Sequence, residues 1–385
     1  MSAKPKILVF VDWYLPGYKA GGPIQSVANV VRALASSFTI RIVTRNTDYG
    51  DPEPYAGIPV NRWVRQEHAE VLYLDERRIS FFTIRHIIQR EQPDFVYLNS
   101  LFSARFTLYP LLALRLGKDR PRVVLAPRGM LAPKALSFKR WKKTFFLRLA
   151  ALVGLYDNLV WHAATTTEAE EVRRMFGPAV PLQVAEHLIF LNNLPSASLI
   201  AEKDPRRRTF VFIARIHPIK NLHVAIGYFA NVRPRSNVVF DIYGPIEEAS
   251  YWARCQEAIE QVNGIEIRYC GELAHHEVEA TLRTYHFFLF PTLNESFGHV
   301  VLEALGNGCP VIVSTNTPWR RLQEQGVGWD LPLEAPQAFV ETIEAAIDME
   351  EERYQAMAAC AIAFARAIAA KPDRRRAHEA LFQTP

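Results

Sequence analysis

The chain alternates short apolar runs with longer stretches in which apolar residues recur every three or four positions. Short runs bounded by turn residues predict buried strands, and the longer pattern predicts helices. Strands that alternate with helices are typical of parallel sheets, so the sequence predicts an α/β fold. The predicted strands span residues 7–11, 38–44, 70–74, 94–99, 122–126, 182–185, 209–214, 238–243, 265–269, 287–290 and 310–313. The predicted helices span 24–35, 80–90, 104–116 and 221–232, with a mostly helical tail over 335–385.

The length of the chain predicts two domains, because 385 residues exceed what one hydrophobic core usually organises. We expect the first domain at residues 1–190 and the second at 209–364. Between them, residues 191–208 contain two prolines and the charged run KDPRRR, a composition typical of a linker. Residues 365–385 form the helical end of the chain.

Composition indicates a folded protein, with 49% hydrophobic and 22% charged residues. No apolar run reaches the roughly 18–20 residues that a membrane span needs. The four cysteines show no C-x-x-C pairing, which favours free thiols in a reducing cytoplasm over zinc or disulfides. Residues 1–190 hold 26 Lys and Arg against 16 Asp and Glu (+10), and the remainder holds 19 against 24 (−5), which sum to the net +5. The two halves are therefore expected to bind different partners.

The most informative stretch is HFFLFPTLNESFGHVVLEALGNGCPVIVS, from His286 to Ser314, which predicts a strand, a loop, a helix and a second strand. Ser296 is expected to be the N-cap of the helix. Glu295 and Glu303 then lie about 80° apart around the helix axis, so both can face one crevice at the carboxyl end of the sheet. An alternative interpretation is that Glu295 only complements the helix dipole and Glu303 is a solvated side chain.

The start of this helix is also a candidate anion site. Backbone amides at a helix N-terminus lack intrahelical acceptors, and a glycine lets a ligand approach the backbone. With a phosphate on these amides and hydroxyl groups on the two carboxylates, the site would suit a nucleotide sugar. The amides expected to face the phosphate are those of Phe297, Gly298, His299 and Val300.

A pair of cations follows the predicted strand at 209–214. Arg215 and Lys220 bracket a loop that leads into a helix, and two cations at such a position can bind a diphosphate. The alternative is an ordinary exposed basic loop.

Two glycines, Gly21 and Gly22, lie between the first strand and the first helix. Strand, glycine loop and helix can bring a backbone close to a phosphate, although a simple tight turn would look the same. The stretch is not G-x-G-x-x-G, and the next strand is not followed by an acidic residue at Thr44-Arg45. Dinucleotide binding is therefore disfavoured.

Other polar residues end strands of the first domain. Asn99 and Arg128 lie in loops where a bound acceptor would be handled. His162 precedes a predicted capping sequence, Thr167-x-x-Glu170, and is interpreted as a strand-end histidine with satisfied hydrogen bonds.

Residues 134–149 interleave basic and aromatic side chains. Such a helix could contact an anionic membrane surface or a lipid-linked phosphate acceptor. The alternative is a helix with one core face and one solvated basic face. No nucleic-acid motif accompanies the basic residues, so nucleic acid is not expected as a partner.

The stretch E-S-F-G-H-V-V-L-E, followed by A-L-G-N-G-C-P-V-I, resembles the E-x7-E signature of retaining enzymes in glycosyltransferase family 4. APRGML resembles a subgroup found in bacterial capsule and exopolysaccharide clusters. The resemblance implies the GT-B fold, in which two Rossmann-like domains with parallel sheets face a central cleft. It also implies that the last helix, within 365–385, crosses back to the first domain.

The resemblance assigns roles to the candidate residues. It implies that Glu295 contacts the hydroxyls of the donor sugar, Glu303 the ribose, and Arg215 with Lys220 the pyrophosphate. Gly21 and Gly22 match glycines placed against the donor phosphate and sugar. Two features depart from the family: Arg128-Gly129 stands where a histidine is common, and residues 186–189 read EHLI where relatives read N-G-[IV]-D.

The implied activity is retaining, metal-independent transfer from a UDP- or GDP-sugar to a hydroxyl of a glycan or polyprenyl-diphosphate-linked acceptor. It belongs to surface polysaccharide synthesis, in the cytoplasm or at the inner face of the plasma membrane. No cofactor is expected, and the chain has no D-x-D pair to hold a metal. Alternatives are a GT-B sugar-nucleotide epimerase or phosphorylase and a catalytically inactive scaffold in a polysaccharide-assembly complex.

Overall fold

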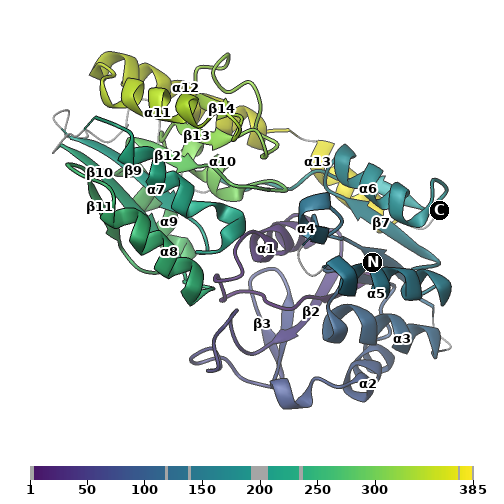
Figure 1. Cartoon of the computed structure of the whole chain (residues 1–385). Helices are drawn as coiled ribbons and strands as arrows, with labels where there is room; N and C mark the ends of the chain where they lie inside the picture. The colour runs from purple at the N-terminus through teal and green to yellow at the C-terminus, as the bar shows by residue number, and fades with distance from the viewer. Residues whose placement is uncertain are drawn as a thin grey trace. The chain divides into compact units, whose positions relative to one another are not determined.

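The computed structural model of the chain describes residues 4–117, 120–137, 140–191, 207–233, 237–371 and 373–383 (Figure 1). The chain divides into two compact units, Met1–Ile189 with Pro372–Pro385 (unit 1) and Phe190–Lys371 (unit 2). Each unit has its own largely parallel sheet with helices packed against it, which confirms the predicted α/β class. Most of the predicted linker, residues 192–206, lies outside the described residues.

The sheet of unit 1 has eight described strands in the order β3-β4-β2-β1-β5-β6-β7-β8. All neighbouring strands are parallel except β3 and β4. From β1 the chain winds first toward one edge and then, from β5, toward the other, so the order of winding reverses between β1 and β5. The strands are β1 Lys6–Phe10, β2 Thr39–Arg45, β3 Trp63–Arg65, β4 Glu70–Leu74, β5 Phe95–Leu98, β6 Arg122–Leu125, β7 Leu159–Ala163 and β8 Leu182–Val184.

The helices of unit 1 differ from the predictions at two points, the start of one helix and the capping residue of another. The predicted helix over 104–116 begins as a π-helical turn, η2 Ala104–Leu108, before α3. The predicted capping residue Thr167 is wrong: Thr165 is the N-cap, and its side chain accepts a hydrogen bond from the amide of Glu168. The helices are α1 Gly22–Leu34, η1 Glu76–Arg78, α2 Phe81–Glu91, α3 Tyr109–Arg115, α4 Pro133–Ser137, α5 Arg140–Leu152, α6 Thr166–Phe176 and α13 Asp373–Leu381.

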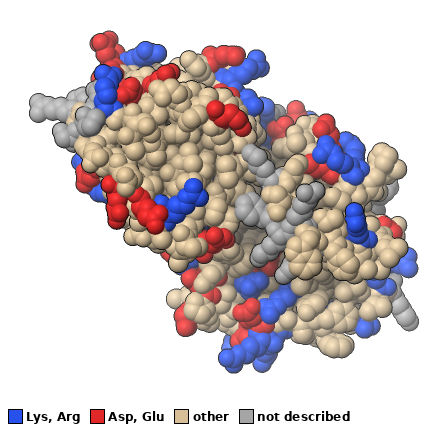
Figure 2. All heavy atoms as spheres, viewed as in Figure 1, with Lys and Arg blue, Asp and Glu red and all other residues tan. Residues whose placement is uncertain are grey.

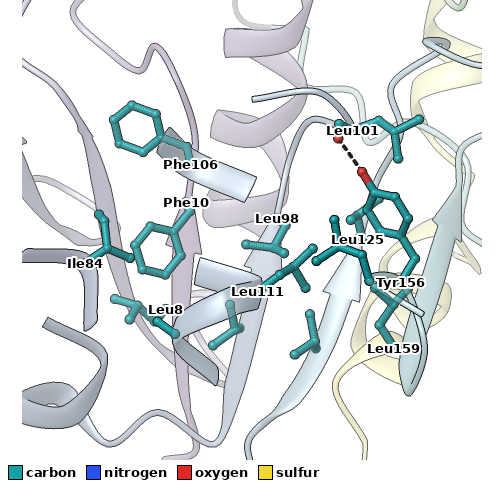
Figure 3. Close-up of a cluster of buried hydrophobic side chains, with 14 of the residues drawn as sticks. Leu8, Phe10, Ile84, Leu98, Leu101, Phe106, Leu111, Leu125, Tyr156 and Leu159 are labelled. Carbon is teal, nitrogen blue, oxygen red and sulfur yellow. Dashed lines mark hydrogen bonds between the residues drawn. The ribbon is translucent and has the colours of Figure 1, made fainter. Parts of the chain in front are cut away.

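One face of the unit 1 sheet packs against α2, α3 and the chain before β7 (Figure 3). Leu8 and Phe10 of β1 contribute to this core. Val9 between them is also apolar and buried, because a parallel strand is covered on both faces of its sheet. Tyr156 is buried in the same cluster, and its hydroxyl donates to the carbonyl of Leu101 at 2.8 Å. That bond satisfies the one polar group that Tyr156 brings into the core.

The C-terminal helix α13 belongs to unit 1, where it packs against α1. Phe382 is buried directly after the helix, with its ring centroid 5.8 Å from Phe95 and 5.4 Å from Tyr97. Ser37, after α1, donates to Glu379 at 2.9 Å. Helix α13 and Phe382 therefore pack against α1 and β5, which belong to the first hundred residues of the chain.

The sheet of unit 2 has the order β11-β10-β9-β12-β13-β14, and its paired strands are parallel. This is the doubly wound Rossmann order, with the reversal between β9 and β12. Right-handed crossovers in opposite directions put the helices on both faces of the sheet. The strands are β9 Arg208–Ile213, β10 Val238–Tyr243, β11 Glu266–Tyr269, β12 Phe287–Phe290, β13 Val311–Ser314 and β14 Gly328–Leu331.

Helices α9, α10 and α12 of unit 2 pack together, and α7 packs on α8 and α11. The predicted helix over 221–232 is confirmed as α7 within two residues at its C-terminal end. The helices are η4 Pro218–Lys220, α7 Leu222–Ala230, α8 Ala249–Glu260, α9 His275–Arg283, α10 His299–Gly306, α11 Pro336–Ile347 and α12 Glu351–Ala369.

None of the four cysteines, all of which lie in the described ranges, forms a disulfide. Within the described ranges, none of the helices combines the length and apolar character that a membrane span requires. On the face shown in Figure 2, basic and acidic side chains are interspersed on the surface.

Phe382→Ala should destabilise unit 1 by about 3–5 kcal/mol, because the change leaves a cavity among three aromatic rings. Urea unfolding followed by circular dichroism measures the loss. Gln383→Ala, at the exposed neighbouring position, should change stability by less than about 0.5 kcal/mol. Equal stability of the two variants would show that the C-terminal segment is not part of the unit 1 core.

Candidate functional site

The candidate residues of unit 2 gather at the carboxyl ends of β9 and β12, where the winding of the sheet reverses. Arg215 follows β9 by two residues, and Lys220 ends the short helix η4. Glu295 lies in the loop between β12 and α10. This edge is where open α/β sheets bind their ligands.

Hydrogen bonds join the two loops to each other. The amide of Leu293 donates to the carbonyl of Ile219 at 2.8 Å, and the Thr292 hydroxyl donates to the same carbonyl at 2.9 Å. The side-chain amide of Asn221 donates to the carbonyl of Pro291 at 3.0 Å. The positions of Lys220 and Glu295 are thus fixed relative to one another by backbone contacts on both sides.

Lys220 and Glu295 form an ion pair, with Nζ 2.7 Å from Oε2. Both side chains are largely buried, with 16% and 18% of their surfaces exposed. Burial alone would raise the pKa of Glu295, but the Lys220 charge, its hydrogen bond, the Phe297 amide and the nearby His299 lower the pKa on balance. Glu295 is therefore a charged carboxylate held by a buried cation.

Helix α10 begins later than predicted. Its N-cap is Gly298, in the left-handed region at φ 78°, so the prediction that Ser296 caps the helix is wrong. The reason is that Gly298 adopts a left-handed conformation, which a right-handed helix excludes, so the helix can begin only after it. Glu295 therefore precedes the helix and does not share its surface with Glu303.

Gly298 is required by both conformation and space. A left-handed φ disfavours any residue with a Cβ. A Cβ at this position would also lie 3.1 Å from Cγ of Glu295 and 3.2 Å from Cγ2 of Val301. The turn places the N-terminus of α10, with its positive dipole end and the amides of His299 and Val300, beside Glu295. The amide of Phe297, predicted to face a phosphate, instead donates to the Glu295 carboxylate.

Trp319 supports this loop and was not predicted from the sequence. Its indole Nε1 donates to the carbonyl of Phe297 at 2.5 Å. The Phe297 ring lies between Trp319 and His299, with centroids 5.3 and 4.8 Å away. The signal available in the sequence was T-P-W, which begins four residues after the predicted strand at 310–313, at the same edge of the sheet.

Glu303 lies on α10 and is half-buried, so it is not a fully solvated side chain. Burial, together with the negative charge of Glu279 on α9, raises the pKa of Glu303 to about 7. The two glutamates of the E-x7-E stretch therefore have opposite environments: a cation keeps Glu295 ionised, whereas Glu303 has a pKa near 7.

Arg215 is paired with a residue that sequence reasoning missed. Its Nη1 lies 2.5 Å from Oε2 of Glu247, which follows β10. The two predicted cations are thus each matched with a carboxylate at this edge. A bound diphosphate would exchange these partners for its own oxygens.

In unit 1, Gly21 is the N-cap of α1 at φ 69°, and Gly22 is the first residue of that helix. Apart from its two chain neighbours, no described residue has an atom within 4 Å of the position where a Cβ would stand on Gly21. The preceding loop is held by Asp48, whose carboxylate accepts from the amides of Tyr18 and Lys19 at 2.8 and 3.1 Å. Space and a fixed helix N-terminus are therefore both present at the glycine pair.

Asn99 and Arg128, predicted to handle an acceptor, contact each other. Nη2 of Arg128 donates to Oδ1 of Asn99 at 2.7 Å and to the hydroxyl of Tyr97 at 2.8 Å. Tyr97 in turn lies 2.8 Å from Nδ1 of His162, and Nε2 of His162 lies 3.0 Å from the carbonyl of Ala185. Since Nε2 must donate to that carbonyl, Nδ1 accepts from Tyr97.

His162 is a structural residue, as predicted. Burial, with smaller effects of His378 and Arg128, lowers the pKa of His162 well below its ordinary value. The ring is therefore neutral, with both nitrogens hydrogen-bonded.

Residues 186–189, which depart from the family pattern, pack against the first and last helices of unit 1, α1 and α13. His187 lies 3.2 Å from the hydroxyl of Ser26 on α1, and Asn29 donates to the carbonyl of Leu188 at 2.9 Å. Glu186 pairs with Arg374 of α13 at 3.2 Å.

Helix α5 has apolar side chains on two faces. Leu147 and Ala150 are buried in unit 1, whereas Trp141 is 73% and Phe145 68% exposed. Leu149 and Leu152 continue the exposed stripe. The solvated face of α5 therefore carries large apolar side chains as well as basic ones. Residues 138 and 139 of the predicted 134–149 segment lie outside the described residues.

Two family models match the chain, one over each set of candidate residues. The model described as "Glycosyl transferase 4-like domain" matches residues 21–186. The model described as "Glycosyl transferases group 1" matches residues 198–362. The chain is a glycosyltransferase. A comparison of this glycosyltransferase with curated proteins gave no significant match.

Solved structures resemble the glycosyltransferase along almost its whole length. HepE from Anabaena, in complex with UDP and glucose, has a TM-score of 0.70 at 16% identity, over 94% of this chain and 95% of that one. WaaG, a glycosyltransferase involved in lipopolysaccharide biosynthesis, has a TM-score of 0.66 at 13% identity, over 98% of each chain. A UDP-forming α,α-trehalose-phosphate synthase from Burkholderia xenovorans has a TM-score of 0.70 at 12% identity, over 99% and 100%. These likenesses confirm the predicted GT-B fold with two Rossmann-like units.

Proposed function

We propose that this glycosyltransferase is a retaining, metal-independent enzyme of family 4 that transfers a sugar from a UDP- or GDP-sugar to an acceptor hydroxyl. The observation that carries the proposal is the Lys220–Glu295 pair beside the N-terminus of α10. It combines a cation and a helix dipole, which suit a diphosphate, with an ionised carboxylate, which suits sugar hydroxyls.

Each candidate residue of unit 2 then has a role in donor binding. Arg215 and Lys220 bind the pyrophosphate, together with the amides from Gly298 to Val300. Glu295 accepts hydrogen bonds from the donor sugar, and Glu303 from the ribose. Gly21 and Gly22 of unit 1 approach the donor phosphate and sugar.

The reaction requires stabilisation of charge on the departing diphosphate. The bond between the anomeric carbon and the β-phosphate oxygen breaks, the acceptor oxygen bonds to that carbon from the same side, and the acceptor proton passes to the departing phosphate. Arg215, Lys220 and the positive end of α10 stabilise the negative charge that develops, without a metal. Because Lys220 keeps Glu295 ionised, the carboxylate also stabilises the positive charge that develops on the sugar.

HepE supports a uridine donor, since that protein has been crystallised in complex with UDP-glucose. For the acceptor, we propose a glycan or a polyprenyl-diphosphate-linked saccharide in surface polysaccharide synthesis. Asn99 and Arg128 lie at the strand ends of unit 1 where it would bind.

We place the enzyme in the cytoplasm, at the inner face of the plasma membrane. The exposed apolar stripe on α5 lies on the same helix as the exposed Arg148. Among residues 134–149, the sequence holds six Lys or Arg and no Asp or Glu. Apolar residues that enter the lipid and cations that meet anionic headgroups are the two contributions on which peripheral binding depends.

UDP should raise the melting temperature of the full-length protein, equally with and without magnesium. A ligand at 100 times its Kd adds about 2.7 kcal/mol, or several degrees. Arg215→Ala should abolish the shift, whereas Arg353→Ala, which removes an exposed charge on α12, should not. GDP, ADP and dTDP serve as competitors in the same scan.

No shift with any nucleotide would favour an inactive scaffold. Where UDP binds, NMR of the products with UDP-sugar separates the remaining activities. Retention at the anomeric carbon of a transferred sugar, or of slowly hydrolysed donor, supports the proposal, and inversion or epimerised UDP-sugar contradicts it.

UDP affinity should rise with pH through the titration of Glu303. Because its pKa is about 7, the carboxylate is mostly protonated at pH 6 and mostly ionised at pH 8, and only the ionised form accepts both ribose hydroxyls. Calorimetric Kd values should tighten by roughly tenfold between these pH values. Glu303→Gln should flatten the profile, leaving only the ionisation of UDP itself, and Glu279→Gln should move the rise to lower pH. Identical profiles in Glu303→Gln and the unmodified protein would remove Glu303 from the site.

The triple change Trp141→Ser, Phe145→Ser and Leu149→Ser should weaken binding to anionic phosphatidylglycerol vesicles by at least tenfold. The three side chains are exposed, so the fold is expected to remain intact by circular dichroism. A matched control replaces Met175 and Ile246, which are also exposed. Cosedimentation measures binding, and equal binding of all three proteins would contradict membrane contact through α5.

A further inference from the structure

Arg128 is a half-buried cation without a carboxylate partner among the residues that the structure describes. Its Nη2 donates only to neutral oxygens, those of Asn99 and Tyr97. Its Nε is buried and has no hydrogen-bond acceptor in the described part of the chain. A guanidinium withdrawn from water in this way is unfavourable unless an anion compensates it.

The neighbouring carboxylates have their own donors. Asp12, after β1, accepts from Arg45 at 3.1 Å and from Ser103 at 3.0 Å. Glu168 accepts from two backbone amides, those of Gly129 at 2.6 Å and Ala164 at 2.7 Å. Neither carboxylate forms an ion pair with Arg128 in the described structure, so the positive charge at this edge has no direct partner.

Asn99 adds a second unsatisfied donor at the same place. The residue is only 6% exposed, and its Nδ2 has no hydrogen-bond partner among the described residues. Its Oδ1 is fixed by Arg128, which leaves the amide nitrogen pointing elsewhere. Buried polar nitrogens are nearly always hydrogen-bonded, so a shared missing acceptor explains both orphan donors.

The position is where unit 1 should bind a ligand. Asn99 follows β5, which borders the reversal of winding, and Arg128 follows β6 beside it. Arg128 is held in the left-handed region at φ 55°, which is unusual for a residue with a long side chain. The Gly129 amide, bound by Glu168, keeps this backbone in place. Unfavourable conformations of this kind persist mainly where they serve a site.

The stretch of sequence that contains Arg128 is basic, which suits a group with more than one negative charge. From residue 120 to residue 156 the sequence contains nine Lys or Arg and no Asp or Glu. A phosphate also presents three terminal oxygens, which can meet the forked donors of Arg128 and the amide of Asn99 together.

We propose that Arg128 and Asn99 form a subsite for a phosphate or diphosphate group carried by the acceptor. The inference rests on the proposed function and specifies its acceptor: the hydroxyl that receives the sugar belongs to a molecule with a phosphate, which this subsite holds and orients. Tyr97, with His162 behind it, positions Arg128 and does not touch the ligand.

The test is calorimetric titration of the full-length protein with pyrophosphate, at low salt and with saturating UDP to occupy the donor site. The key variant is Asn99→Asp, which places a carboxylate 2.7 Å from Nη2 of Arg128 and removes the orphan amide. Pyrophosphate affinity should fall at least tenfold, while the melting temperature stays the same or rises. Arg90→Gln, an equal change of charge on the exposed face of α2, should leave the affinity unchanged.

Arg128→Lys separates shape from charge, since it keeps the cation and loses the fork; it should weaken pyrophosphate binding less than Asn99→Asp. A merely structural role for Arg128 predicts unchanged affinity in Asn99→Asp, and that result overturns the proposal. So does binding of glucuronate, but not pyrophosphate, through the same residues.

The two proposals fail in different ways. Normal UDP binding with no pyrophosphate binding overturns the subsite alone. Absence of binding of both UDP and GDP overturns the donor assignment alone, and pyrophosphate is then titrated into Arg215→Ala, in which the cation pair of unit 2 is disabled. Loss of the remaining signal on adding Asn99→Asp to that variant still supports the subsite, and an unchanged signal overturns it.

Discussion

The ion pair between Lys220 and Glu295 fixes the geometry of unit 2 at its ligand-binding edge. It joins a loop after β9 to a loop after β12, across the point where the sheet reverses its winding. A buried carboxylate is tolerated there only because a cation and a backbone amide face it. Backbone hydrogen bonds between the same loops mean that the pair does not have to be ordered when a ligand arrives. Preorganised charge of this kind is the largest contribution that a protein makes to many reactions.

The two units differ in how their charges are compensated. In unit 2, Arg215 and Lys220 each have a carboxylate partner. In unit 1, Arg128 has only neutral acceptors among the described residues. When a ligand phosphate displaces an internal carboxylate from a cation, one favourable contact replaces another. The net gain in binding free energy is therefore smaller than when a phosphate binds an unpaired cation. The paired cations therefore suit a ligand that must leave, and the unpaired one suits a group that must be held in place.

Most strands could be predicted from the sequence because buried parallel strands are apolar throughout, whereas the half-buried antiparallel edge strand β3 was missed. The glutamates could be predicted because their spacing resembles a known signature. The predictions failed where distant residues decide local structure. Ser296 does not cap α10, because the left-handed Gly298 delays the start of the helix, while the amide of Glu295 bonds across to Asn316. Glu247 and Trp319 lie far along the chain from their partners Arg215 and Phe297, and sequence spacing carries no record of those contacts. Charge compensation at Arg128 is likewise invisible until the side chains are placed.

The position of α13 has a consequence for synthesis. Domains usually fold in order as the chain leaves the ribosome, the N-terminal one first. Here Phe382 completes an aromatic cluster with residues near the start of the chain, Phe38 and Phe95. Unit 1 therefore cannot close its core until residues 373–382 have been translated, and unit 2 has the opportunity to fold before it. During that interval an incomplete apolar surface on the first half of the chain is open to chaperones.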